Sequence, residues 1–336
     1  MTERTRVGII GAGAIVQVAH LPVLRRMKNV DLVAICDSDL PKARVVADRF
    51  KITDAFDDIE EVLQYEELDV LLICTPNHLH ESHILAALSR GLHVLVEKPL
   101  ATSVDSVKRI KNAVDKHDRV LMVGMNHRYR PDVEIVRGFV QSGELGAIES
   151  IRGSWHVFKP SRSQLGWRLK RELSGGGAML DLGLAILDLG LWLAGNPAPK
   201  RVTASFGKSA GDGPVEQAGS AYIICESGPS IFLDVTWNHI GAGERFGVGL
   251  RGAKGSASIN PLTVWKKMHG APMDVSPSGA GSRENAFSAS YRAEWAHFLA
   301  AIRGEAAAPP LQDYLTLQKV IDAIYRSAAT GREVKL

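Results

Sequence analysis

The first residues that could do chemistry are Gly11 and Gly13, which follow an apolar stretch in the run Val7–Val16. Gly11 permits a tight turn, and Gly13 has no side chain, so the backbone can approach a pyrophosphate. A helix that begins here would offer free N–H groups and the positive end of its dipole to the phosphates. The third position of this glycine fingerprint, usually Gly or Ala, is Val16, which implies slightly wider helix–strand packing. A tight turn without a ligand is the alternative, but we expect a dinucleotide to contact Gly11, Gly13, Ala14 and Ile15.

An acidic residue stands where such a ligand would place its adenosine ribose. Asp37 follows the apolar run Leu32–Cys36 and lies 24 residues beyond Gly13. A carboxylate at this point accepts hydrogen bonds from the ribose hydroxyls and repels a 2′-phosphate. No arginine follows Asp37 directly, so the sequence favours NAD over NADP. The alternative, in which Asp37 caps the next helix, stays open.

A further apolar run ends in residues that could line the nicotinamide half of the ligand. Thr75, Pro76, Asn77 and His80 follow the run Val70–Cys74. The carboxyl ends of parallel strands are where ligands bind in such folds. We therefore expect these four residues to contact the cofactor.

Lys98 is the residue that could act on a substrate. It stands in Glu97-Lys98-Pro99, directly after the apolar run Val94–Val96, and the proline holds its backbone extended. An amine beside a nicotinamide is placed to polarise a hydroxyl or a carbonyl group. The alternative is a surface lysine on a loop.

The elements that must position these residues divide the chain at about residue 124. Up to that point short continuous apolar runs alternate with amphipathic stretches, which predicts a doubly wound parallel sheet, a Rossmann domain, over residues 1–124. Residues 125–336 contain runs with two-residue alternation, as in Ile231–Asn238, which predict an antiparallel or mixed sheet with two unlike faces. We expect this part to be an α+β domain with a large open, mostly antiparallel sheet. We expect this domain to bind the substrate, and a final helix over about residues 313–330 to return to the first domain. The Gly/Ser/Pro stretches Gly207–Gly219 and Gly270–Ser282 are expected to be loops.

Composition excludes several classes of protein. The chain has 336 residues, 45% hydrophobic and 23% charged, with a net charge of +3, which is too balanced for a protein that mainly holds nucleic acid. Its longest wholly apolar runs, such as Val70–Cys74, have about five residues, so no membrane span is expected. The N-terminus lacks a secretory signal pattern. The cysteines Cys36, Cys74 and Cys225 lie far apart in apolar runs, so we expect reduced thiols, no metal site and a cytoplasmic location.

Taken together, the motifs resemble the glucose–fructose oxidoreductase and inositol dehydrogenase family (Gfo/Idh/MocA), and the resemblance covers essentially the whole chain. It is carried by Gly11-x-Gly13, Thr75-Pro76-Asn77-x-x-His80, Glu97-Lys98-Pro99, Gly124–Pro131, and Gly166-Trp167-Arg168 followed by Gly175-Gly176-Gly177. The resemblance implies an NAD(P)-dependent transfer of a hydride at a carbinol carbon of a sugar, cyclitol or related polyol. It implies that Lys98 is catalytic and also touches the nicotinamide ribose, that Glu97 and Asn126 contact the cofactor, and that the C-terminal sheet makes homodimers or homotetramers.

The sequence departs from the family at its active-site helix. The family pattern D-x-G-x-H-x-x-D matches here at Asp181 and Asp188, but Ala185 takes the place of the histidine that usually accepts the proton. A general base contributes about 10²–10⁴ in rate, and alanine cannot supply it. The candidates to replace it are Lys98, Asp181, His156, Lys159 and His239.

Asp181 and Ala185 are four residues apart and share a helix face. We therefore expect Asp181 to be catalytic, orienting substrate hydroxyls or coupling to Lys98. The alternative is a helix-terminal aspartate that the dipole favours. Other expected substrate contacts are His156, Lys159, Trp167, Arg168 and Ala185, with His156 facing away from Trp155.

Three functions remain open at this point. The first is an NAD(H)-dependent dehydrogenase or reductase of a sugar-like polyol. The second is a redox-neutral, NAD-dependent enzyme that cleaves or eliminates glycosides. The third is a catalytically weak NAD-binding regulatory protein, which Ala185 suggests.

Overall fold

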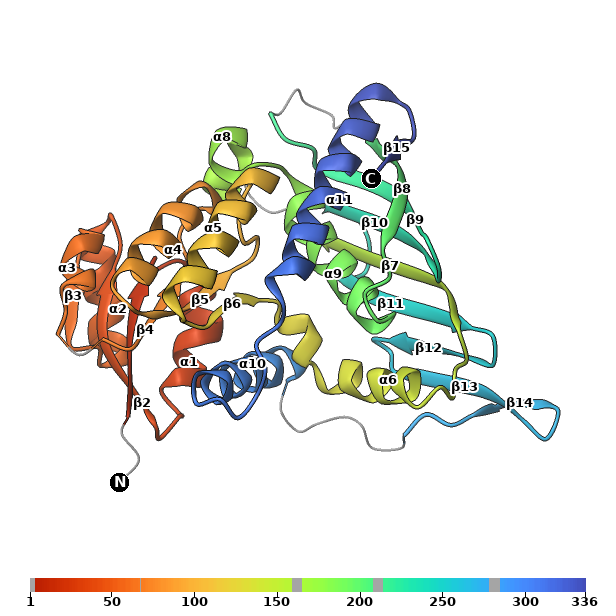
Figure 1. Cartoon of the computed structure of the whole chain (residues 1–336), viewed down its shortest axis with the longest axis horizontal. Helices are drawn as coiled ribbons and strands as arrows, with labels where there is room; N and C mark the ends of the chain where they lie inside the picture. Colours follow the sequence, from red (N-terminus) through yellow and green to blue (C-terminus); the bar gives the residue numbers. More distant parts are fainter. Residues whose placement is uncertain (1–3, 67, 159–164, 208–213, 278–284) are drawn as a thin grey trace. The chain divides into compact units, whose positions relative to one another are not determined.

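The computed structural model describes residues 4–66, 68–158, 165–207, 214–277 and 285–336 (Figure 1). The chain forms two compact units. The first consists of Met1–Asn126 with Phe287–Leu311, and the second of His127–Ala286 with Gln312–Leu336. The chain therefore crosses two residues later than the expected boundary, and it returns once more to the first unit after the second has been built.

The first unit contains a six-stranded parallel sheet in the order β3-β2-β1-β4-β5-β6, which is the doubly wound arrangement that the sequence predicts. Five of the strands coincide with the predicted continuous apolar runs. The sixth, β3, lies at the sheet edge and has only three partly buried residues, too few for a periodic signal. The strands are β1 (Thr5–Ile10), β2 (Val30–Cys36), β3 (Asp54–Phe56), β4 (Val70–Ile73), β5 (His93–Glu97) and β6 (Leu121–Gly124).

Helices separate these strands along the chain. The first begins as a π-helical turn, η1 (Val16–His20), and continues as α1 (Leu21–Leu24). Single π-turns inside helices are frequent at functional sites. The others are α2 (Leu40–Phe50), α3 (Ile59–Leu63), η2 (Asn77–Leu79), α4 (His80–Ser89) and α5 (Val104–His117).

One helix from late in the sequence completes the core of the first unit. The helix α10 (Ala286–Ile302) places Trp295 and Phe298, each with no exposed surface, in the same apolar cluster as Val7 and Ile9 of β1. The return to the first unit is thus made by α10. The last helix, α11 (Leu311–Thr330), belongs almost entirely to the second unit, where the Ser327 hydroxyl accepts a hydrogen bond of 2.9 Å from the Ala204 amide.

The second unit contains a nine-stranded sheet, β14-β13-β12-β11-β7-β10-β9-β8-β15, in which only β7 and β10 pair in parallel. In β10, Ile231, Leu233, Val235 and Trp237 are buried and alternate with more exposed residues, as predicted. The strand β14 falls inside the stretch Gly270–Ser282, for which the sequence predicts a loop. Its four residues are all exposed, so no alternating pattern marks it in the sequence. The strands are β7 (Ile148–Phe158), β8 (Pro199–Phe206), β9 (Ala218–Cys225), β10 (Ser230–His239), β11 (Arg245–Gly252), β12 (Gly255–Ile259), β13 (Thr263–Met268), β14 (Ala271–Asp274) and β15 (Val334–Lys335).

The central helix of the second unit lies on one face of this sheet (Figure 1). It begins as the π-helical turn η5 (Met179–Gly183) and continues as α9 (Leu184–Leu193), which is buried along nearly its whole length. Gly153 of β7 allows this close packing, because a Cβ there would collide with Ile186. The remaining helices are η3 (Asn126–Tyr129), α6 (Pro131–Gln141), η4 (Gly166–Leu169) and α8 (Arg171–Ser174).

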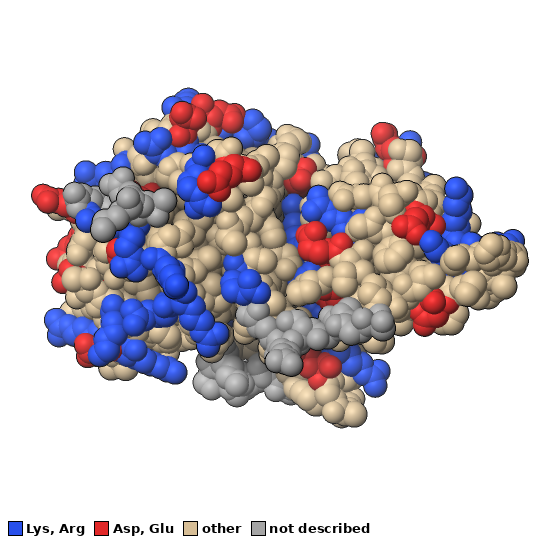
Figure 2. All heavy atoms as spheres, turned by 90° about the horizontal axis from the view of Figure 1, so that it is seen from below, with Lys and Arg blue, Asp and Glu red and all other residues tan. Residues whose placement is uncertain are grey.

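The helical stretch Arg171–Leu193 has the length and apolar character of a membrane span, but 89% of its most apolar window is buried inside the molecule. This stretch is therefore buried in the way that is typical of a core helix. Figure 2 shows acidic and basic side chains interspersed on one face of the protein, with Lys and Arg more frequent over the first unit. This distribution agrees with the small net charge of +3.

Candidate functional site

The glycine turn after β1 has the backbone that a dinucleotide site requires. Gly11 has φ +94°, and a Cβ there would lie 2.5 Å from the Cys74 carbonyl oxygen, so only glycine fits. A Cβ on Gly13 would meet no other atom within 4 Å, so the space in front of this residue is open. The residues present therefore fit a pyrophosphate held against the backbone. Val16, at the third fingerprint position, is fully buried under the turn.

Asp37 lies at the end of β2 and braces this turn. Its Oδ2 accepts a hydrogen bond of 2.8 Å from the Ala12 amide, and its Oδ1 accepts one of 3.0 Å from the Asp39 amide. The cap of α2 is Asp39, whose carboxylate accepts from the Lys42 amide at 3.1 Å. The alternative role for Asp37 as helix cap is therefore not the one found. Lys42, which the sequence reading missed, also places its ammonium group 2.7 Å from Asp37 Oδ1.

The residues after β4 form a braced loop. His80 is 1% exposed, and its ring nitrogens lie 2.7 Å from the Pro99 carbonyl oxygen and 2.9 Å from that of Thr75. Burial lowers the pKa of His80, although both carbonyl groups act in the opposite direction. The Thr75 hydroxyl lies 3.1 Å from Nδ1 of His83. His80 thus joins the β4 loop to the segment that follows Lys98.

Glu97 and Lys98 occupy the carboxyl end of β5, on the same sheet edge as the glycine turn. Glu97 is 8% exposed, and its Oε2 accepts a hydrogen bond of 3.2 Å from the Lys98 amide. Its Oε1 lies 2.9 Å from His20 Nε2 and accepts a bond of 3.3 Å from the Tyr291 hydroxyl. Burial raises the pKa of Glu97, but the hydrogen bond from His20 and the charge of Lys98 outweigh it, and the pKa is lowered.

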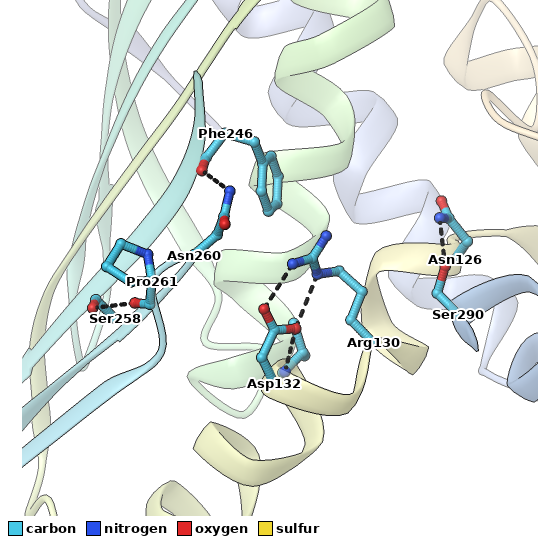
Figure 3. Close-up of polar contacts among 9 residues, drawn as sticks. Asn126, Arg130, Asp132, Phe246, Ser258, Asn260, Pro261 and Ser290 are labelled. Atoms are coloured by element: carbon cyan, nitrogen blue, oxygen red, sulfur yellow. Dashed lines mark hydrogen bonds and ion pairs between the residues drawn. The ribbon is translucent and has the colours of Figure 1, made fainter. Parts of the chain in front are cut away.

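Asn126 closes this part of the first unit. Its Nδ2 donates a hydrogen bond of 3.0 Å to the Ser290 hydroxyl of α10 (Figure 3). Asn126 is 9% exposed. The side-chain amide of Asn126 therefore fixes the end of β6 against α10.

In the second unit, the helix that carries Asp181 is held at its beginning by Glu216. The Glu216 carboxylate accepts hydrogen bonds from the amides of Gly177 at 2.9 Å and Met179 at 3.0 Å, and from the Tyr325 hydroxyl at 2.6 Å. A Cβ on Gly176 would collide with Tyr325, so this approach requires glycine. Burial raises the pKa of Glu216 although these donors act in the opposite direction.

Asp181 itself is held from the sheet. Its Oδ2 accepts a hydrogen bond of 3.2 Å from the Trp237 indole of β10. Asp181 is only partly buried, in contrast to its neighbours on η5, whereas Ala185 is 4% exposed. The helix therefore keeps the Asp181 carboxylate partly accessible, and the methyl group of Ala185 lies one helical turn further on.

The second aspartate of the motif uses both carboxylate oxygens in hydrogen bonds. Asp188 makes two hydrogen bonds with Arg128, at 2.7 and 2.5 Å, and both side chains are almost completely buried. Burial lowers the pKa of Arg128, but the charge and hydrogen bonds of Asp188 outweigh it, and the pKa is raised. Asp188 thus ties α9 to the segment 126–131, where the chain passes from the first unit to the second. We call these residues the crossover segment.

The crossover segment also carries an aromatic cluster that the sequence reading missed. His127 stacks on Phe246 with ring centres 4.8 Å apart, and Trp155 meets both rings edge-on. Arg130 bonds to Asp132 at 3.0 and 2.7 Å and lies 5.1 Å from the centre of the Phe246 ring (Figure 3). These contacts fasten the segment to β7 and β11.

The other expected substrate residues are dispersed. His156 lies 2.8 Å from Asp234 on the sheet face opposite to Trp237, so the structure does not bring it to the side of Asp181. His239 lies beside it, with ring centres 5.5 Å apart. Arg168 lies over the Trp167 ring at 4.6 Å in η4. Lys159 lies outside the described residues.

A doubly wound sheet with an open glycine turn, an aspartate at the end of β2 and a lysine at the end of β5 defines the class of dinucleotide-binding oxidoreductases. Residues 5–125 match the model of an oxidoreductase family with an NAD-binding Rossmann fold, and residues 133–258 match the GFO/IDH/MocA C-terminal domain. The chain belongs to the Gfo/Idh/MocA family of NAD-binding oxidoreductases.

Relatives of known name cover nearly the whole chain. The D-glucoside 3-dehydrogenase of Escherichia coli K12 is 29% identical over 352 residues, which cover 98% of this chain and 97% of that protein. An uncharacterized oxidoreductase of Rhizobium meliloti, ORF334, is 30% identical and covers 98% of each chain. The crystal structure of GenD2 from gentamicin A biosynthesis, in complex with NAD, has a TM-score of 0.88 and 26% identity, covering 100% of this chain and 97% of that chain. Levoglucosan dehydrogenase with NADH, at 23% identity over 99% of each chain, shares the fold with a TM-score of 0.90.

Proposed function

We propose that this protein is an NAD(H)-dependent dehydrogenase or reductase that transfers a hydride to or from a carbinol carbon of a sugar, cyclitol or related polyol. The observation that carries the proposal is the position of Lys98 at the end of β5, on the sheet edge where the glycine turn opens. Relatives named as dehydrogenases of a D-glucoside and of scyllo-inositol support the substrate class.

The proposed chemistry divides between two side chains. When bound, NAD supplies the hydride acceptor. In the direction of oxidation the carbon loses a hydride, and Lys98 accepts the hydroxyl proton as the carbonyl group forms; in reduction Lys98 returns it. Asp181 accepts hydrogen bonds from substrate hydroxyls. The hydrogen bond from the Trp237 indole fixes the orientation of its carboxylate. Ala185 has no group that can take up a proton, so we assign the proton transfer to Lys98 among the candidates that the sequence offers.

NAD is proposed as the cofactor because the Asp37 carboxylate would face a 2′-phosphate at close range. The residues proposed to hold it are Gly11, Gly13, Ala14, Ile15, Asp37, Thr75, Pro76, Asn77, His80, Glu97, Lys98 and Asn126. Lys42 lies beside Asp37 and lessens this repulsion, and two relatives are named as NADP⁺-dependent. Parallel titrations with NAD and NADP test the preference.

We also propose a cytoplasmic homodimer or homotetramer that forms through the sheet of the second unit. The helices η5 and α9 cover one face of this sheet, and Tyr222 and Phe232 are 43% and 40% exposed on the other. Light scattering measures the mass, and Phe232→Asp is expected to lower it if this face is the interface.

The direct test is a panel of sugars and cyclitols incubated with NAD or NADH while the absorbance of the reduced nicotinamide is followed. A net change that depends on one sugar-like substrate supports the proposed reaction. Ala185 is the observation that favours the regulatory function, and the same assay separates it from the redox-neutral one. Product without net change of the nicotinamide would assign the redox-neutral reaction, and NAD binding without any turnover would assign the regulatory function.

A further inference from the structure

Four buried side chains of the first unit form a connected group behind Lys98. His20 comes from η1, Glu97 from β5, and Tyr291 and Trp295 from α10. His20 and Trp295 have no exposed surface, and Tyr291 is 4% exposed. Groups this deeply buried cost free energy unless each donor meets an acceptor, so the hydrogen bonds determine where the protons are.

The indole of Trp295 determines the tautomer of His20. Trp295 Nε1 lies 2.9 Å from His20 Nδ1. An indole N–H can only donate, so His20 Nδ1 must accept with a free electron pair and carries no proton. The one ring proton is then on Nε2, which donates to Glu97 Oε1 at 2.9 Å. His20 is therefore a neutral donor, and its contact with Glu97 is a hydrogen bond between a neutral ring and a carboxylate.

This tautomer leaves Glu97 as an anion whose charge His20 does not cancel. The carboxylate accepts from His20, from Tyr291 and from the main-chain amide of Lys98. The other acidic groups that face it add no charge, because burial and the charge of Glu97 raise the pKa values of Glu294 and Tyr291 well above their usual ranges. Burial does the same for the thiol of Cys74. Burial raises the pKa of Glu97, but His20, and after it the charge and the main-chain amide of Lys98, lower it, so the carboxylate stays ionised between these donors.

We propose that Trp295 is a positioning residue for catalysis: it holds His20 in the neutral Nε2–H form, whose donation to Glu97 keeps that carboxylate in place against the main-chain amide of Lys98. The proposal rests on the proposed function, because it concerns the reaction only if Lys98 is the reacting amine. Without the indole donor, either ring nitrogen of His20 can carry the proton. The donation from Nε2 that holds the Glu97 carboxylate beside the Lys98 amide is then no longer fixed.

The tautomer can be measured without any activity. In the full chain labelled with ¹⁵N-histidine, the signal of His20 is identified by its loss in His20→Gln. We expect an unprotonated Nδ1 and a protonated Nε2 in the wild type, and a mixture of the two tautomers in Trp295→Phe. Tyr291→Phe is the matched control, since it removes a donor to Glu97 but leaves His20 Nδ1 bonded. A wild-type ring with a proton on Nδ1, or a Trp295→Phe ring that keeps its proton on Nε2 alone, overturns the proposal.

Activity gives the second readout. In Trp295→Phe we expect kcat to fall several-fold while the affinity for NAD changes little, because Glu97 no longer holds the main chain of Lys98 in one position. Phe298→Leu, a packing change on the same helix, is expected to lower stability and leave kcat nearly unchanged. Equal kcat values in Trp295→Phe and the wild type contradict the proposal. If no substrate is turned over, the proposed function fails, while the NMR result still decides the tautomer.

Discussion

The buried pair of Arg128 and Asp188 gives the most quantitative prediction. Their side chains are 4% and 1% exposed and share two hydrogen bonds, so solvent does not screen them. Replacement by Asp188→Asn leaves the guanidinium charge buried without its counter-ion. Breaking such a pair costs about 3–5 kcal/mol of unfolding free energy. For a unit of this size, that corresponds to a fall of about 6–20 °C in Tm.

The double variant Arg128→Met/Asp188→Leu distinguishes a charge effect from a shape effect. It removes both charges and keeps comparable volume, so we expect it to recover most of the stability that the single change loses. Urea unfolding followed by tryptophan fluorescence reports the second unit, which contains Trp192 beside Arg128. A cost of less than about 1 kcal/mol for Asp188→Asn, or a double variant as unstable as the sum of its parts, refutes the reasoning.

Three further changes test other parts of the account. Asp37→Ala is expected to narrow the ratio of NAD to NADP affinity measured by calorimetry, and an unchanged ratio would exclude Asp37 as the source of the preference. Glu216→Gln weakens acceptance from the Gly177 and Met179 amides, so kcat should fall several-fold more than NAD affinity, which the first unit supplies; equal losses contradict this. Glu294 has both carboxyl oxygens buried without a hydrogen-bond partner among the described residues, and burial raises its pKa well above the usual value. The native state therefore holds a proton that the unfolded chain releases above about pH 4.5. Stability should therefore fall from about pH 5 to pH 8 more steeply in the wild type than in Glu294→Gln, and parallel curves would contradict the assignment.

The sequence predicts the first unit well because its strands are buried on both faces and read as continuous apolar runs. The same logic finds Gly11, Asp37 and Lys98, since each stands at the carboxyl end of a predicted strand. It fails for β14, whose residues are all exposed and carry no periodic signal.

The residues that support the site are beyond sequence reasoning for a different reason. Trp295 and His20 are 275 residues apart, and Glu216 reaches Tyr325 across 109 residues. Glu216 lies in a stretch that reads as a loop, so nothing local marks it as the anchor of the Asp181 helix. Trp237 was predictable as an inward-facing residue of an alternating strand, but the hydrogen bond from its indole to Asp181 was not.

The role of Lys98 is tested most directly by the rate of hydride transfer in a single turnover of Lys98→Ala, measured beside its affinity for NAD. We predict a loss of about 10²–10⁴ in the rate with NAD affinity nearly preserved, because the amine acts on the proton of the substrate while the glycine turn and Asp37 hold the dinucleotide. A variant that transfers hydride almost as fast as the wild type would contradict the account.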